Sequence, residues 1–397
     1  MSQAGSQRSA SWRPGRSVPP RVLIISGSVG AGHDGAAEAL ATRLRASGMR
    51  VDRRDFLDAL PGPVRATLRG CYAAIVTFAP WAFGWAFTNV ERGGAMHRLS
   101  MALCALAKRR VAQWLQAEYQ GVVSTYPFAS QTVGQLRASG QMQCPAVTFL
   151  TDPAVHRLWV HPGVDHHLTV TQATADQGAG DYQTVMQVGG PLVGAAFRRA
   201  PDSTAALRAR SSIRAELDIS QQTAVALILT GSLGMGDVVA TVEAVVAGGA
   251  AVPIVACGRN ERLRRSLAPQ LGVRALGWRE DVADLMMAAD VLITNAGGLS
   301  FTEALVIGLP AVCFAPIPGH GRANAQVLNA SGLAPWARTT AELTEALKAA
   351  TRPGHRHRLV PAPDCRVDKF VAELATGQPG DQSQPRRATR RRRRAAA

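Results

Sequence analysis

Short apolar runs alternate with amphipathic stretches along the chain from Arg21 onward. This alternation predicts parallel sheets covered by helices. In the first half we expect one helix from about Asp34 to Ala46. The strands expected there are Val22–Ser26, Met49–Phe56, Gly121–Ser124, Ala146–Leu150 and His167–Val170.

The second half repeats this pattern after a connection at Pro191–Pro201. Its expected strands are Ala224–Thr230, Val252–Ala256, Val273–Leu276, Val291–Thr294 and Ala311–Ala315, and its expected helices include Arg279–Ala288 and Ser300–Ile307. The fold class is therefore α/β, with two Rossmann-like, doubly wound domains. Ligands of such sheets bind at the carboxyl ends of the strands, so the two domains should face a central cleft.

We assign residues 21–195 to the first domain and residues 196–375 to the second. Residues 1–20 and 376–397 are predicted to be disordered tails, because they are rich in Arg with small or polar residues and carry no apolar period. The length of 397 residues and the hydrophobic share of 47% are sufficient for two buried cores.

The segment Cys71–Val90 carries no charged residue and is rich in aromatic side chains, among them Trp81 and Trp85. Three structures fit this composition: a transmembrane span, a buried core helix, or an aromatic surface that enters the lipid interface. Pro80 and Gly84 interrupt the segment, which disfavours a span, and we expect the interfacial surface.

The net charge of +16 is concentrated in the tails. Residues 1–21 hold four Arg and no acidic residue, and residues 376–397 hold seven Arg against the single Asp381. Such clusters attract nucleic acid or anionic lipid. Because no motif for base recognition accompanies them, we expect an anionic membrane surface as partner and no specific nucleic acid.

Six scattered cysteines without a C-x-x-C pair indicate reduced thiols in an intracellular protein. The N-terminal residues lack the apolar stretch of a signal peptide. We therefore expect a cytoplasmic protein.

A Gly-rich loop, Gly27–Gly35, joins the first strand to the first helix. Its Gly30, Gly32 and Gly35 fit the G-x-G-x-x-G pattern, and Asp52 lies at a distance that allows a dinucleotide site. The loop lacks the final Lys-Ser/Thr of a P-loop, so an NTPase is excluded.

His33 stands in this loop at the start of the helix, where the helix dipole disfavours a protonated imidazole. A neutral imidazole at the mouth of a cleft suits a general base that removes a proton from an attacking hydroxyl. The structural alternative is that His33 only caps the turn.

Two turns in the second half are suited to phosphate. Gly297, Gly298, Leu299 and Ser300 open a helix after a strand, so their free N–H groups form an anion site. The turn Thr230–Gly236, which includes Ser232, follows another strand. Together the two turns favour a nucleoside diphosphate.

Glu303 has two interpretations. The spacing Ser300-x-x-Glu303 is that of a capping box, in which the carboxylate binds a backbone N–H. Alternatively, the carboxylate accepts hydrogen bonds from both hydroxyls of a ribose.

No metal site or cofactor is expected. The sequence contains no D-x-D, and its clustered histidines lack the H-E-x-x-H spacing of a zinc site. The histidines in question, for which loop or core packing is the preferred interpretation, are His156, His161, His166 and His167.

Several motifs together resemble a known group of enzymes. The motifs are Ser28–His33, Ala79–Trp81, Ser124–Phe128, Thr151–Gly163, Cys257–Asn260 and Gly297–Leu305. The chain resembles the GT-B glycosyltransferases of the monogalactosyldiacylglycerol synthase and processive diacylglycerol glucosyltransferase type, in glycosyltransferase family 28, related to the lipid II-forming N-acetylglucosaminyltransferase.

This resemblance implies an inverting, metal-independent hexosyltransferase of glycolipid biosynthesis. A UDP-sugar would be the co-substrate and a membrane lipid such as diacylglycerol the acceptor. His33 matches the proposed base. The resemblance places the acceptor and membrane side at Gly30, Gly32, Trp81, Trp85, Tyr126 and Asp152, and the nucleotide-sugar site at Ser232, Gly258, Arg259, Trp278, Gly297, Gly298, Leu299, Ser300, Glu303, His320 and Asn324.

The sequence departs from the family pattern at three places. Tyr126 stands where a histidine is usual, Asn295 lies near the position of a usual lysine, and Pro318–Asn324 replaces a Gln/Glu-rich segment that reads the sugar. The alternatives are a UDP-sugar epimerase of GT-B architecture, a transferase acting on a polyprenyl-linked or other non-glycerolipid acceptor, and a non-catalytic basic module that binds membrane or nucleic acid. For the transferase we expect peripheral association with the inner face of the plasma membrane.

Overall fold

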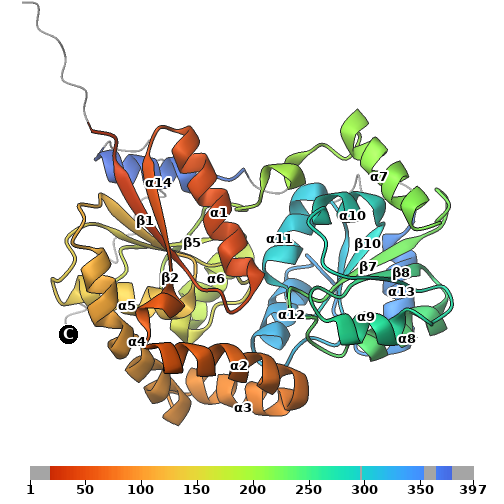
Figure 1. Ribbon diagram of the computed structural model, residues 1–397, viewed down its shortest axis with the longest axis horizontal. Coiled ribbons are helices and arrows are strands. Elements are labelled where there is room, and N and C mark those ends of the chain that lie inside the picture. The colour runs from red at the N-terminus through yellow and green to blue at the C-terminus, as the bar shows by residue number, and fades with distance from the viewer. Residues whose placement is uncertain (1–17, 296, 353–363, 378–397) are drawn as a thin grey trace, which may run out of the picture.

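The computed structural model describes residues 18–295, 297–352 and 364–377 and contains two parallel sheets (Figure 1). The first sheet has the strand order β2-β1-β3-β4-β5-β6. Its strands are β1 (Arg21–Ser26), β2 (Arg50–Asp55), β3 (Gly121–Ser124), β4 (Ala146–Phe149), β5 (His166–Thr169) and β6 (Met186–Val188). All five strands predicted in this half are confirmed. The short β6 was not predicted, because three residues are too few for a periodic signal.

Helices and 3-10 turns cover both faces of this sheet. They are α1 (Ala31–Ala46), η1 (Phe56–Ala59), α2 (Gly62–Phe78), α3 (Pro80–Glu91), α4 (Ala95–Trp114), α5 (Pro127–Ala138), η2 (Arg157–Trp159) and α6 (Gln172–Asp181). Proline stands in the first turn of α2, α3 and α5, where its missing N–H costs no helical hydrogen bond.

The second sheet has the order β11-β10-β7-β8-β9. Its strands are β7 (Val225–Leu229), β8 (Val252–Ala256), β9 (Arg274–Leu276), β10 (Val291–Thr294) and β11 (Ala311–Cys313). The 3-10 turn and helices around it are η3 (Ala195–Arg198), α7 (Thr204–Glu216), α8 (Val238–Gly248), α9 (Glu261–Leu267), α10 (Val282–Ala288), α11 (Gly298–Ile307), α12 (His320–Ala330) and α13 (Thr340–Ala350).

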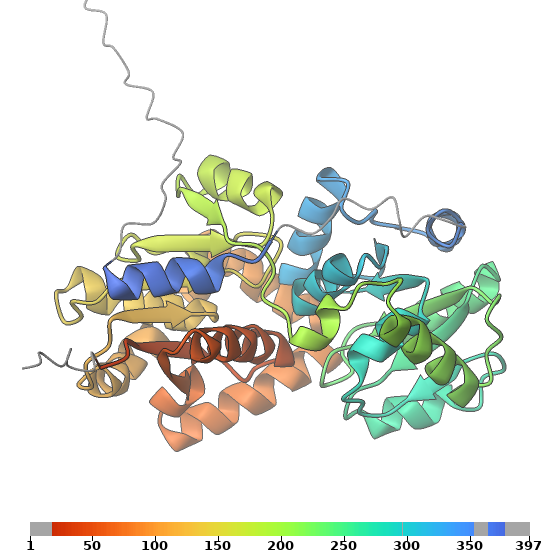
Figure 2. The ribbon, with the colours of Figure 1, turned by 90° about the horizontal axis from the view of Figure 1, so that it is seen from above.

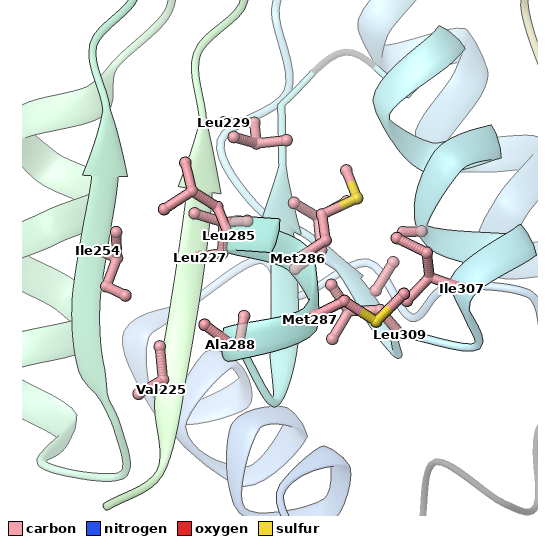
Figure 3. Close-up of a cluster of buried hydrophobic side chains, with 14 of the residues drawn as sticks. Val225, Leu227, Leu229, Ile254, Leu285, Met286, Met287, Ala288, Ile307 and Leu309 are labelled. Carbon is pink, nitrogen blue, oxygen red and sulfur yellow. The ribbon is translucent and has the colours of Figure 1, made fainter. Parts of the chain in front are cut away.

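The hydrophobic core of the second domain is built on strands β7 and β8. Apolar side chains of β7 and β8 pack against α10 and the end of α11, as Figure 3 shows for Leu227, Ile254, Met286 and Ile307. Several helices of this domain begin at a polar cap; for example, the Ser203 side chain accepts a hydrogen bond from the backbone N–H of Ala206.

Each sheet reverses its strand order at one place, and these two places determine where a ligand can bind. In the first sheet the reversal lies between β1 and β3, so the loops after these strands separate and leave a crevice. In the second sheet it lies between β7 and β10. The Gly-rich loops found in the sequence therefore belong to the crevice of each domain.

The last described helix, α14 (Val367–Thr376), corrects the predicted domain boundary. Residues up to 375 were assigned to the second domain, but Val367 and Val371 of α14 pack into the core of the first domain. Asp368 forms an ion pair with Arg43 of α1 at 3.2 Å. Figures 1 and 2 show α14 beside α1 of the first domain. The second domain is thus an insertion closed by α14, whereas the predicted tails fall almost wholly outside the described residues.

The aromatic segment Cys71–Val90 is divided between two environments. In the described residues no single helix is long and apolar enough to cross a membrane. The bent pair Gly62–Val76 and Pro80–Glu91 together has the length and composition of a membrane span, and nothing more than length and composition indicates one. Phe78, Trp81 and Trp85 face outward with exposed fractions of 81%, 74% and 59%. Other aromatic residues of the segment turn inward and line the cleft described next.

Candidate active site

A cavity of about 800 Å³ lies between the two domains. The loop after β1, the loops after β3 and β4, and helices α2 to α4 line it from the first domain. The loops after β7, β8, β9 and β10 line it from the second. Both strand-order reversals therefore open into one space, as the predicted cleft requires.

His33 lies at this cavity and is oriented by the first domain. Its Nδ1 is 2.8 Å from the carbonyl oxygen of Thr125 and 3.0 Å from the hydroxyl oxygen of Thr151. Because a carbonyl only accepts, Nδ1 carries the proton and donates it to Thr125, which leaves Nε2 as the acceptor. Burial lowers the pKa of His33, although Asp152 and the bond to Thr125 partly oppose this shift. The ring is a neutral base near pH 7.

Asp152 is a buried carboxylate beside three histidines. It accepts a hydrogen bond from the indole N–H of Trp159 at 3.1 Å, and one of its oxygens lies 3.9 Å from Nε2 of His156. Burial raises the pKa of Asp152, but His320, His33 and His156 lower it more, so the net shift is downward. Burial in turn lowers the pKa of His156 to about 4. Asp152 is therefore the ionised carboxylate of the cluster, and His156 is a neutral imidazole near pH 7.

The start of α11 provides free backbone N–H groups at the cavity. Gly297 and Gly298 adopt positive φ angles of 71° and 63°, which glycine permits without strain, and the next residues begin the helix. Gly297, Gly298, Leu299 and Ser300 all line the cavity, as predicted.

Glu303 does not form the capping box that its spacing allows. The residue at the cap of α11 is Gly297, so Ser300 lies inside the helix and caps nothing. Within the described part of the chain, the Glu303 carboxyl group has no hydrogen-bond or ion-pair partner. It is only 9% exposed and lines the cavity, and burial raises its pKa to about 8. Its second interpretation, as a ligand for hydroxyl groups, is thereby favoured.

Ser232, Gly258 and Trp278 line the second-domain side of the cavity. Gly258 lies so close to the turn after β7 that a Cβ there would be 2.4 Å from the carbonyl oxygen of Gly231. Arg259 does not line the cavity itself, but its guanidinium stacks over the Trp278 ring at 4.5 Å. Trp278 thus lines the cavity, and Arg259 supports its ring from outside the cavity.

The last glycine of the G-x-G-x-x-G pattern has a packing explanation. A Cβ on Gly35 would lie 2.5 Å from the Leu299 side chain, and one on Gly32 would lie 3.5 Å from it. The glycines let the first turns of α1 and α11 meet across the domain boundary. Packing therefore accounts for Gly35, whereas a Cβ on Gly30 would meet nothing within 4 Å.

Asn324 and His320 both contact residues of the first domain. Asn324 does not line the cavity and is 1% exposed. Its side chain accepts from the N–H of Ala154 at 2.9 Å and donates to Asp152 at 3.3 Å, so it links α12 to the first domain. His320, which does line the cavity, packs edge-on against Phe83 of α3.

The remaining predicted residues are placed as follows. Gly30, Gly32, Tyr126 and Asp152 line the cavity, whereas Trp81 and Trp85 lie outside it on the exposed face of α3. Among the residues that the structure describes, no three His, Cys, Asp or Glu side chains are grouped to hold a metal ion.

Sequence reasoning missed several cavity residues. Thr125 and Thr151 orient His33, and both stood inside quoted motifs next to residues that were selected. Tyr72, Phe83 and Phe87 line the cavity from α2 and α3, although their segment was read as one interfacial surface. The helical period of the aromatic residues could have separated the two faces.

Comparisons with known proteins agree with this architecture. Residues 33–191 match the family model of monogalactosyldiacylglycerol (MGDG) synthase, and residues 225–375 match that of the glycosyltransferase family 28 C-terminal domain. A processive diacylglycerol beta-glucosyltransferase of Bacillus cereus (strain AH187) is 25% identical over 350 residues, covering 83% of this chain and 85% of the relative.

Solved structures share the fold at low sequence identity. MurG of Acinetobacter baumannii aligns with a TM-score of 0.51 at 16% identity, over 90% of this chain and all of that protein. Arabidopsis thaliana UGT89C1 complexed with UDP aligns with a TM-score of 0.53 at 15% identity, again over 90% and 100% of the two chains. The chain is therefore a two-domain glycosyltransferase of GT-B fold, whose first domain matches the family of monogalactosyldiacylglycerol synthase and whose second domain matches glycosyltransferase family 28.

Proposed function

We propose that the protein transfers a hexosyl group from a UDP-sugar to a hydroxyl of a membrane lipid such as diacylglycerol, with inversion and without a metal ion. The observation that carries the proposal is the geometry of one cavity. An oriented neutral imidazole from the first domain and the free helix start of α11 from the second domain line the same space.

His33 is proposed as the general base. Its Nε2 would take the proton from the acceptor hydroxyl while that oxygen attacks the anomeric carbon. The hydrogen bond from Nδ1 to Thr125 keeps the tautomer in which Nε2 is free. The ionised Asp152 would stabilise the imidazolium that forms, since its negative charge already raises the pKa of His33.

The leaving group is proposed to be UDP. When the bond from the anomeric carbon to the phosphate oxygen breaks, negative charge develops on the diphosphate. The N–H groups at the start of α11 would stabilise this charge without a metal ion. Glu303 is proposed to accept hydrogen bonds from the ribose hydroxyls, because its carboxyl group is buried and has no partner within the described residues.

The acceptor is proposed to arrive from a membrane at the side of α2 and α3. The outward-facing Phe78, Trp81 and Trp85 would enter the lipid interface, and the Arg-rich ends would attract anionic lipid. The inner face of α3 supports this arrangement, because Phe83 and Phe87 line the cavity directly. The enzyme would thus be peripheral, on the inner face of the plasma membrane. The B. cereus relative is named for diacylglycerol, which supports this choice of lipid.

A transfer assay tests the proposal. The protein is incubated with radiolabelled UDP-glucose or UDP-galactose and vesicles containing diacylglycerol, with a chelator present. Label that moves into the lipid fraction supports the transferase. Label that remains in an altered UDP-sugar instead indicates an epimerase, and binding to vesicles or nucleic acid without any reaction indicates a non-catalytic module.

The His33→Ala variant tests the role of the base. We expect the transfer rate to fall about 10²–10⁴-fold, the usual contribution of general base catalysis, while UDP affinity is retained. Calorimetric titration with UDP provides the control for folding. A turnover near that of the wild type would contradict the assignment.

A further inference from the structure

The chain has four tyrosines, and they differ in what their hydroxyl groups contact. Tyr119 donates to Asp52 at 2.6 Å, and Tyr182 donates to Glu91 at 2.6 Å. Within the described residues, the hydroxyls of Tyr72 and Tyr126 have no hydrogen-bond partner, and both residues line the cavity. The two tyrosines at the cavity are thus the two whose donors remain available.

Tyr126 is held rigidly at this position. It is 8% exposed, stacks on Phe128 at 5.6 Å between ring centroids, and meets the edge of His33 at 5.1 Å. Its ring occupies the space above Gly27, where a Cβ would lie 2.5 Å away. A fixed ring places its hydroxyl without further loss of side-chain entropy on binding.

Ser100 of α4 is a third donor of the same kind. It is 7% exposed, lines the same cavity, and its hydroxyl has no partner in the described part of the chain. A serine hydroxyl in a helix can bond a carbonyl one turn back, so an unpaired hydroxyl at a cavity is available to a ligand.

The surroundings of these donors are apolar and carry no positive charge. We call the first-domain part of the cavity the apolar chamber; it is formed by Leu57, Leu68, Phe83, Val90, Leu103 and Phe128. Asp152 is the only acidic residue among its neighbours in the first domain, and the described lining residues of that domain include no Lys or Arg. An anionic group would therefore enter without a counter-ion and would meet a carboxylate.

We infer that the hydroxyls of Tyr126, Tyr72 and Ser100 donate hydrogen bonds to carbonyl oxygens of an uncharged, ester-bearing acceptor whose hydrocarbon chains fill the apolar chamber. The inference rests on the proposed lipid acceptor and adds which part of that lipid is recognised. Ester carbonyls accept strong hydrogen bonds, whereas the ether oxygens of a dialkyl lipid are weaker acceptors. The site therefore selects ester lipids over ether lipids of equal chain length.

The selectivity is measured as the ratio of kcat/KM for dioleoylglycerol to that for its dialkyl ether analogue. Both are presented in phosphatidylcholine vesicles, and radiolabelled UDP-glucose and UDP-galactose are each tested as donor. We expect the wild-type protein to favour the ester by about tenfold for each hydrogen bond gained. In Tyr126→Phe, Tyr72→Phe and Ser100→Ala this ratio should fall towards one.

Tyr119→Phe is the matched control, because it removes a phenol hydroxyl that already has a partner outside the cavity. Its ester-to-ether ratio should equal that of the wild type. Equal wild-type rates on the two lipids would overturn the inference, as would a ratio that survives all three cavity substitutions. Transfer to neither lipid would contradict the proposed function itself, so the two failures are distinguishable.

Discussion

Replacing Glu303 by glutamine should stabilise the second domain at alkaline pH and leave its stability almost unchanged at acidic pH. Glu303 is 9% exposed, and burial raises its pKa from 4.5 to about 8. Between these two values the folded chain keeps the proton that the unfolded chain has lost. Stability must therefore fall as pH rises through this window.

The magnitude follows from the two pKa values. Each pH unit corresponds to about 1.4 kcal/mol, so the interval from 4.5 to about 8 amounts to roughly 5 kcal/mol. The carboxyl group lines an open cavity, where water can partly solvate its charge, and we expect about 3–5 kcal/mol in practice. Glutamine has the same shape and no titratable proton. Glu303→Gln therefore does not lose stability by ionisation of this buried group above pH 8.

Calorimetric unfolding of the nucleotide-free protein at pH 5, 7 and 9 measures the effect. A gain of about 3–5 kcal/mol corresponds to a rise of about 6–20 °C in the Tm of the second-domain transition at pH 9. All other titrations cancel in the difference between variant and wild type. Ser300→Ala, which alters the same helix without a titratable group, should shift the Tm equally at all three pH values. A Glu303→Gln difference that is independent of pH would refute the reasoning.

Three further predictions follow from the same structure. UDP binding at pH 7 should release up to one proton, because ribose hydroxyls that donate to Glu303 favour its ionised form. Titration calorimetry in two buffers of different ionisation enthalpy measures the proton release, and Glu303→Gln should abolish that release. Gly84→Ala should reduce transfer activity, because its Cβ would lie 2.9 Å from Pro318 of the second domain. In the control Gly70→Ala the added Cβ meets nothing within 4 Å, so this variant should stabilise α2 by about 0.5–1 kcal/mol in a denaturant titration. Replacing both Trp81 and Trp85 by alanine should weaken sedimentation with anionic vesicles while UDP affinity is retained, and unchanged sedimentation would contradict the proposed docking face.

The sequence alone predicted the order of the strands except β6, and most of the site residues that it selected lie at the cavity. Apolar runs of four to six residues predict buried parallel strands wherever they occur, and glycine after such a strand predicts a phosphate-type turn. His33, Ser232 and Glu303 could be selected for this reason, because each stands at a fixed position after a strand or inside the first turns of a helix. These are local properties, since periodicity, turns and helix starts depend on neighbours in the chain.

Only the tertiary structure decided what meets across the domain boundary. The packing of Leu299 on Gly35 explains one glycine of a pattern that looked like a dinucleotide motif. The return of α14 to the first domain, and the turn of Phe83 and Phe87 into the cavity, likewise depend on contacts between distant segments. Whether the Glu303 carboxyl group is capped or available depends on where α11 begins, and α11 begins at a pair of glycines whose positive φ angles the sequence permits but does not require. Such contacts depend on the shape and burial of residues that are far apart in the chain, so they cannot be predicted from a local sequence pattern.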